Sequence, residues 1–309
     1  MTQRGGSVCE VGAKTEAIPR FFPLFDVMRI LLALEVVRCH YGINLGYGFG
    51  DILTPVPMFL ALSGFMVLQS FEHSRNWGHF AWKRALRIVP LYVTTLIAIL
   101  FLFGASEVKG NLLCYASSGF AGTWKNGVVW SLGAEELAYL TLAILYIKGA
   151  YRAIWPIWIG VIISAAFMLY TDYPGIARVN DALYRVQCLP FCFFVGNLAY
   201  VYRAWLLRAG WIGVVLVLCG VFIRMHIELA AIPALFAAPG LILVGLHFRP
   251  KWKAFPDFSY GTYLWHELLF SAIPSSKTIA LLITAVVVVV SRFAIETPFL
   301  KFKNWTLNR

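Results

Sequence analysis

Charged residues are scarce in this sequence of 309 residues. They make up 13% of the chain, against about a quarter in an average soluble domain. Hydrophobic residues make up 60%. One membrane anchor does not account for so large a deficit, and a soluble core of this length would not need a surface so poor in charge. The composition therefore excludes an ordinary soluble domain and predicts an all-α, polytopic bundle of transmembrane helices.

Features typical of other protein classes are also missing. The net charge is +11, but the basic residues stand in short gaps between apolar runs, which favours loops of a membrane protein over a nucleic-acid site. Most of the six cysteines fall inside apolar runs, which argues against a secreted disulfide framework. Cys188 and Cys192 are one helical turn apart without a nearby His. We therefore expect no metal site, no nucleic-acid partner and, because the first apolar stretch carries charges, no cleavable signal peptide.

Ten apolar stretches of about 20 residues are candidate membrane spans. We expect one transmembrane domain over 21–300, a disordered cytoplasmic N-terminal segment over 1–20 and a short cytoplasmic tail over 301–309. The sequence shows no internal repeat and no second domain. The ten stretches lie near 22–43, 52–71, 86–104, 129–147, 153–170, 186–202, 211–224, 230–247, 259–275 and 278–296.

The distribution of Lys and Arg predicts the orientation of these spans. With the N-terminus in the cytoplasm, 17 basic residues fall in inner segments, 6 in outer segments and 3 inside spans. Cytoplasmic loops of membrane proteins carry such an excess of Lys and Arg. The bias therefore predicts an even number of spans and both termini in the cytoplasm.

The first span carries five ionisable side chains, which are Asp26, Arg29, Glu35, Arg38 and His40. An Arg or Asp at mid-depth costs about 2.5–3.5 kcal/mol on insertion scales. A helix with this composition must therefore face protein or a wet cavity rather than lipid.

The spacing places three of these residues on one stripe of the helix. Arg29 and His40 are eleven residues apart, which is close to three whole turns and about 16 Å along the axis. Asp26 precedes Arg29 by three residues and can pair with it. Glu35 and Arg38 fall on the opposite face, where we interpret them as a packing pair. Buried ion pairs that fix helix packing are the alternative for the whole stripe, but ionisable residues inside a membrane are usually functional, and an imidazole can act as a general base or a nucleophile.

Four further segments carry recognisable motifs in a fixed order. They read Val-Pro-Met-Phe-Leu-Ala-Leu-Ser-Gly-Phe over 56–65, Lys-Arg-Ala-Leu-Arg-Ile-Val-Pro-Leu-Tyr over 83–92, Trp-Ser-Leu-Gly-Ala-Glu-Glu-Leu-Ala-Tyr-Leu over 130–140 and Ser-Tyr-Gly-Thr-Tyr-Leu-Trp-His over 259–266, followed by Glu-Thr-Pro-Phe over 296–299. Together with Arg, ten residues and His in the first span, the sequence resembles the membrane acyltransferase-3 family, which O-acylates glycans and related acceptors. The departures are Ile30, Pro57, Ala61, Gly133, Leu137 and Ala138; none removes an ionisable residue, and they bear on substrate class.

The resemblance implies an acyl-coenzyme A donor, commonly acetyl-CoA, that enters from the cytoplasm. Arg84 and Arg87 stand three residues apart, on one face of a helix at the inner boundary, and guanidinium groups suit phosphate oxygens. We expect both, with Lys83, to bind the donor. Ordinary flanking charge on the cytoplasmic side is the alternative, and it accounts for Lys83 by itself.

The motif at 130–140 implies a catalytic carboxylate. Glu135 and Glu136 point about 100° apart on a helix, so both rarely serve one site. The motif favours Glu135 as the group that orients the His40 imidazole, with Glu136 as the fallback and Ser131 one turn earlier. A helix N-terminal acid favoured by the dipole is the alternative.

The motif at 259–266 implies supporting residues. We interpret His266 as a packed, hydrogen-bonded histidine, with a catalytic role as the alternative, and Tyr260 and Tyr263 as interfacial aromatics or acceptor contacts.

These expectations define an integral membrane O-acyltransferase, in multi-pass form in the bacterial inner membrane, with Arg29, His40 and Glu135 as catalytic residues. The acceptor would be a glycan or glycolipid such as an exopolysaccharide. A transporter or flippase with a buried ion-pair pathway is the main alternative, but it predicts repeats or broken helices near the midplane. A membrane scaffold or sensor that retains idle motifs is a third.

Overall fold

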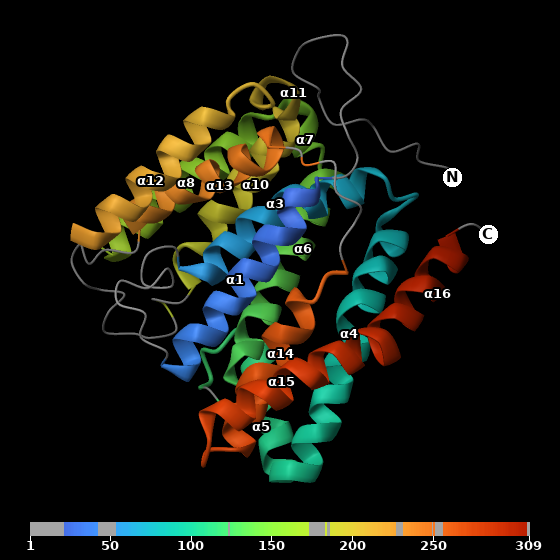
Figure 1. Cartoon of the computed structure of the whole chain (residues 1–309). Helices are drawn as coiled ribbons and strands as arrows, with labels where there is room; N and C mark the ends of the chain where they lie inside the picture. The colour runs from blue at the N-terminus through green and yellow to red at the C-terminus, as the bar shows by residue number, and fades with distance from the viewer. Residues whose placement is uncertain are drawn as a thin grey trace. The chain divides into compact units, whose positions relative to one another are not determined.

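The computed structural model describes residues 22–42, 54–122, 124–172, 183, 186–226, 231–248, 250 and 256–307. The expected N-terminal segment over 1–20 lies outside these ranges. Every regular element within them is helical, which confirms the all-α expectation (Figure 1). The elements are α1 (Pro23–Tyr41), α3 (Pro55–Glu72), α4 (Trp77–Phe103), α5 (Ala105–Ala116), η1 (Gly127–Val129), α6 (Trp130–Ile147), α7 (Ala150–Ala153), α8 (Trp155–Asp172), α10 (Leu189–Val201), α11 (Arg203–Leu206), α12 (Gly210–His226), α13 (Ala231–His247), α14 (Ser259–Ala272), α15 (Lys277–Ser291), the π-helical turn η3 (Arg292–Glu296) and α16 (Thr297–Leu307).

A helix overlaps each of the ten apolar stretches expected from the sequence. Five helical segments are long and apolar enough to cross a membrane, and α10, α12 and α13 are shorter apolar helices. The chain is thus a multi-pass membrane protein, whereas the count of ten spans and the cytoplasmic termini stay predictions. The five segments are Pro55–Glu72, Trp77–Phe103, Gly127–Ile147, Trp155–Asp172 and Lys277–Phe302.

Helix α4 begins nine residues before the apolar stretch that was expected at 86–104. Its N-terminus is set by Asn76, whose side-chain oxygen accepts the backbone N–H of His79. Such a cap satisfies one of the free N–H groups of the first turn. The helix ends at Gly104, whose φ of 91° few other residues adopt. The basic residues at 83–87 therefore lie within the first three turns of a long helix, as expected for Arg84 and Arg87.

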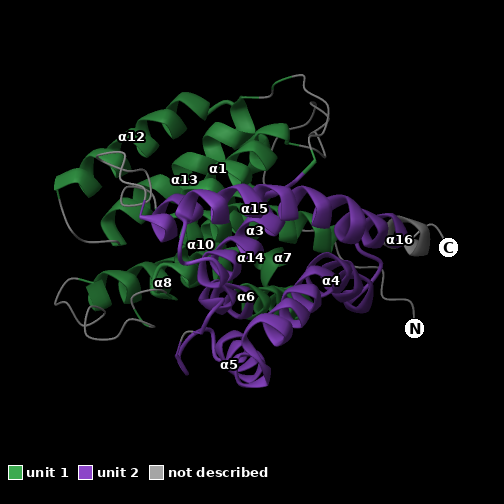
Figure 2. Ribbon diagram, turned by 60° about the horizontal axis from the view of Figure 1, so that its bottom comes forward, with its two compact units in different colours: residues 1–35, 44–73, 135–256 green, residues 36–43, 74–134, 257–309 purple. Residues whose placement is uncertain are grey.

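The chain folds into two compact units (Figure 2). Unit 1 comprises Met1–Glu35, Asn44–His73 and Glu135–Pro256, and unit 2 comprises Val36–Ile43, Ser74–Ala134 and Asp257–Arg309. In unit 1, α10 packs against α3, α8 and α13, and α12 packs against α13. In unit 2, α14 packs against α15, α4 and η1, and α4 also contacts α5 and α16.

Paired glycines bring α3 and α10 of unit 1 close together. A Cβ atom on Gly64 would lie 2.3 Å from the carbonyl oxygen of Phe193, and one on Gly196 would lie 2.2 Å from that of Ala61. Small residues let two membrane helices approach at the backbone level. This crossing holds the motif segment 56–65 against α10.

Candidate active site

Arg29 and His40 both lie on α1, an uninterrupted helix from Pro23 to Tyr41. Their eleven-residue spacing therefore corresponds to the expected separation of about 16 Å along the axis. Asp26 and Arg29 are half-buried, and His40 in the last turn is exposed. The helix thus presents a guanidinium and an imidazole at well-separated heights.

His40 is hydrogen-bonded to His266 of α14. The Nδ1 atom of His40 and the Nε2 atom of His266 are 2.9 Å apart, and the ring centroids are 4.9 Å apart. His266 is fully buried, and its Nδ1 lies 3.0 Å from the carbonyl oxygen of Thr262. The histidines of the first and the fifth motif, 226 positions apart in the chain, therefore form one pair.

Beside this pair, the last turn of α1 is hydrogen-bonded to α14 and α15. The hydroxyl of Tyr41 donates to the backbone oxygen of His266 at 3.3 Å and lies 3.3 Å from the hydroxyl of Thr284. The ammonium group of Lys277 donates to the backbone oxygen of Tyr41 at 2.9 Å, where the negative end of the helix dipole favours a cation. These contacts fix the height and rotation of the turn that carries His40.

Tyr263 and Glu267 of α14 contact Val128 in η1 and Ser131 at the start of α6. The hydroxyl of Tyr263 lies 2.7 Å from that of Ser131, and both hydroxyls lie within hydrogen-bond distance of the backbone oxygen of Val128, at 3.0 and 3.2 Å. Because each hydroxyl has one proton, one of them donates to the other hydroxyl and the second donates to Val128. The carboxylate of Glu267 accepts the backbone N–H of Val128 at 2.7 Å. Tyr263 is buried in this contact. The fourth and fifth motifs are thus joined through polar groups that would be costly to leave without partners in a membrane.

Glu135 lies further along α6, in the part of that helix that belongs to unit 1. Its Oε1 accepts the hydroxyl of Ser63 at 2.8 Å and the hydroxyl of Tyr139. Glu136 beside it is half-buried. Ser63 belongs to the second motif, and our sequence analysis did not single it out. The signal was there, because a hydroxyl inside an apolar segment needs a polar partner.

A family model described as an acyltransferase domain matches residues 23–297 of the chain. The protein belongs to the acyltransferase-3 family. Nodulation protein 10 of Rhizobium leguminosarum bv. viciae is a distant relative, 27% identical over 307 aligned residues that cover 79% of this chain and 82% of that protein. No solved structure matches the chain. The protein is therefore a membrane acyltransferase, with both histidines of the pair inside the matched region.

The basic residues of this acyltransferase at 83–87 have distinct surroundings. Arg87 donates to the carboxylate of Asp257 at 2.6 Å, and the other oxygen of Asp257 accepts the backbone N–H and the hydroxyl of Ser259. Lys83 donates to the hydroxyl of Ser74 at 3.1 Å, and the guanidinium of Arg84 lies 5.6 Å from the ring centre of Phe80. Arg87 thus ties α4 to the first turn of α14.

Tyr260 makes a second connection between α4 and α14 in the acyltransferase. Its hydroxyl donates to the backbone oxygen of Ile88 at 2.8 Å, close to the helix-interior residue Pro90. Tyr260 thus links the first turn of α14 to the backbone of α4, and its roles as an interfacial aromatic or an acceptor contact stay predictions.

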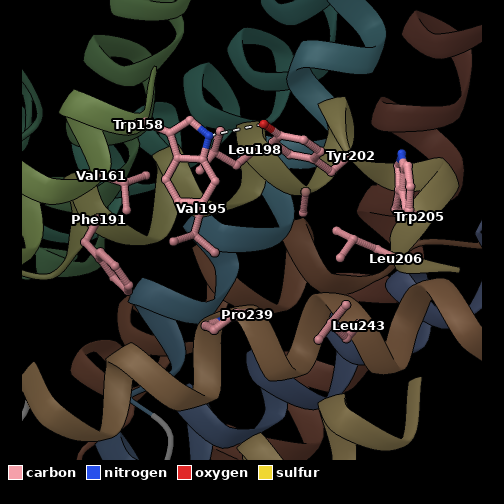
Figure 3. A pocket seen from close by; sticks show the side chains of 11 residues that line it. Trp158, Val161, Phe191, Val195, Leu198, Tyr202, Trp205, Leu206, Pro239 and Leu243 are labelled. Atoms are coloured by element: carbon pink, nitrogen blue, oxygen red, sulfur yellow. Dashed lines mark hydrogen bonds between the residues drawn. The ribbon is translucent and has the colours of Figure 1, made fainter. Parts of the chain in front are cut away.

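A pocket of about 660 Å³ in unit 1 is lined by apolar and aromatic side chains of α8, α10, α11 and α13, among them Val195 and Pro239 (Figure 3). The indole N–H of Trp158 donates to the hydroxyl of Tyr202 across it at 3.2 Å. None of the site residues predicted from the sequence is among the lining residues. Among the residues that the structure describes, no group of three or more His, Cys, Asp or Glu side chains could hold a metal ion.

Proposed function

We propose that this membrane acyltransferase moves an acyl group, with acetyl as the expected one, from cytoplasmic acyl-CoA to a hydroxyl of a glycan or glycolipid. The family places the reaction in the acyltransferase class. The five motifs that run from Arg29 to the segment 296–299 support an O-acyltransferase within it.

The observation that carries the proposal is that His40 is both hydrogen-bonded and exposed. One ring nitrogen of His40 is hydrogen-bonded to a buried partner, while the residue as a whole is exposed. A general base needs this combination, because its ring must be held in place and one nitrogen must still reach the substrate.

His40 therefore removes the proton of the acceptor hydroxyl through Nε2. The acceptor oxygen then forms a bond with the thioester carbonyl carbon, and the carbon–sulfur bond breaks. The same Nε2 returns its proton to the departing thiolate, so that acylated acceptor and free CoA leave together. Arg29 stabilises the negative charge of a donor phosphate or of the reacting carbonyl oxygen.

The remaining predicted residues have supporting parts in the proposal. Arg84 and Lys83 bind the phosphates of the acyl-CoA donor. Asp257 orients the guanidinium of Arg87 toward these phosphates. Glu135 stays a predicted site residue, with a carboxylate that Ser63 and Tyr139 hold in place.

The test replaces His40 by Ala in membranes that contain correctly inserted protein. Radiolabelled acetyl-CoA is supplied, and both the released thiol and the label in the glycan fraction are measured. Loss of a general base lowers rates by about 10²–10⁴-fold, so we expect a fall of at least about 100-fold. His73, an exposed histidine whose ring contacts the backbone oxygen of Gln69, provides the matched control, and His73→Ala keeps full activity.

Two outcomes would count against the proposal. Full activity of His40→Ala would remove this residue from the mechanism. Wild-type membranes that release no thiol from acetyl-CoA while they translocate a glycan would favour the transporter instead. Incubation without acceptor separates the two routes open to the imidazole, because a general base leaves the protein unlabelled and an acyl carrier does not.

A further inference from the structure

The contact between His266 and Thr262 determines which nitrogen of His266 carries a proton. A carbonyl oxygen can only accept, so the Nδ1 atom of His266, 3.0 Å away, must be the donor. Among the described residues, the other hydrogen-bond partner of this fully buried ring is the imidazole of His40. Neither partner compensates a positive charge, and a buried charge without compensation is costly. His266 is therefore neutral, with its proton on Nδ1 and its lone pair on Nε2.

The position of the His266 proton also determines which nitrogen of His40 is protonated. Its Nδ1 lies 2.9 Å from the lone pair of His266 Nε2, so this Nδ1 must be the donor. A neutral imidazole has one N–H. The lone pair of His40 then lies on Nε2, the nitrogen that the buried partner does not engage.

We infer that His266 is a positioning residue that holds His40 in the tautomer able to act as a base. The inference rests on the proposed function, in which His40 Nε2 takes the acceptor proton. In the opposite tautomer of His40, the lone pairs of His40 Nδ1 and His266 Nε2 would face each other at 2.9 Å. The Nε2 atom of His40 would then already carry a proton and could not accept the proton of the acceptor hydroxyl. When Nε2 becomes protonated during the reaction, the hydrogen bond from Nδ1 to His266 becomes charge-assisted and stronger. His266 thus favours both the reactive ground state and the charged state that follows.

A pair of substitutions separates this role from simple packing. In His266→Gln the side-chain amide oxygen can stand close to the place of Nε2 and accept from His40. In His266→Leu a side chain of similar size fills the buried space but cannot accept. We expect His266→Leu to lower kcat for acetyl-CoA-dependent transfer by about 100-fold or more with KM for acetyl-CoA unchanged, and His266→Gln to recover at least about tenfold of that loss.

A spectroscopic measurement reports the tautomer directly. In the purified protein labelled with ¹⁵N in the histidine rings, the resonances of His40 are identified by their loss in His40→Ala. The wild type and His266→Gln show a protonated Nδ1 and an unprotonated Nε2, and His266→Leu shows a mixture of the two tautomers. Equal apparent melting temperatures of the two His266 variants exclude a difference in folding.

Three results would overturn the inference. They are a wild-type spectrum with the proton of His40 on Nε2, a His266→Leu variant with wild-type kcat, and a folded His266→Gln variant as slow as His266→Leu. An inactive His40→Ala together with a fully active His266→Leu would leave the proposed function intact and remove the positioning role alone. Activity in His40→Ala would remove the proposed function itself.

Discussion

Substitution of Gly64 by Ala tests how closely α3 and α10 must approach. The added Cβ would lie 2.3 Å from the carbonyl oxygen of Phe193, whereas real Cβ contacts essentially never fall below 3.0 Å. The helices must therefore separate locally by at least 0.7 Å. The obstacle is backbone, so no side-chain rotation can relieve it, and overpacking of this kind costs about 1–3 kcal/mol.

The assay is the apparent melting temperature of purified protein in one detergent. We expect a fall of several degrees for Gly64→Ala, because about 1 kcal/mol shifts the midpoint by roughly 2–4 °C in larger domains. Gly78→Ala serves as the matched control. Gly78 lies in the exposed first turn of α4, and a Cβ there meets its nearest neighbour at 3.5 Å. Alanine is the better helix former, so this control keeps or raises the midpoint. A Gly64→Ala protein as stable as Gly78→Ala would refute the close helix crossing.

Two further predictions concern the polar contacts of α14. In a double-mutant cycle, Arg87→Ala and Asp257→Ala each lower the free energy of unfolding, and the two changes are less than additive by about 1–2 kcal/mol. Asp257→Ala lowers it more, because Ser259 also loses its hydrogen-bond acceptor. Strict additivity would show that the ion pair contributes nothing to stability. Tyr263→Phe removes the hydroxyl that contacts Ser131 and the Val128 backbone, so denaturant unfolding in detergent shows a free energy of unfolding lower by about 1 kcal/mol. Tyr170→Phe, at an exposed position, leaves this free energy unchanged, and equal stability of the two variants would contradict the contact.

The sequence predicted where most helices lie because apolar runs of membrane length leave a strong signal. It did not predict α5 or α16. Helix α5 contains Glu107 and Lys109, and α16 continues through Lys301, so neither produces a long apolar run. The early start of α4 was missed for the same reason, since its first turns are polar and depend on the cap at Asn76.

The sequence also predicted which residues are candidates for chemistry but not which of them meet. The motif at 130–140 pointed to Glu135, yet the hydroxyl of Ser63 that binds it stands 72 positions away. His40 and His266 were both recognised, but nothing in their local sequences couples them. Contacts between distant segments depend on how helices pack, and helical periodicity describes one helix at a time.

The hydrogen bonds that join the end of α1 to α14 and α15 affect the order of events in biosynthesis. Lys277 and Thr284, which contact Tyr41, are made more than 230 residues after it. His40 is therefore synthesised long before its partner His266, and a nascent chain that ends before residue 266 lacks the ring to which His40 is hydrogen-bonded. If the proposed positioning role of His266 holds, the enzyme becomes active only after the segment from residue 266 onward has been synthesised and has packed against α1.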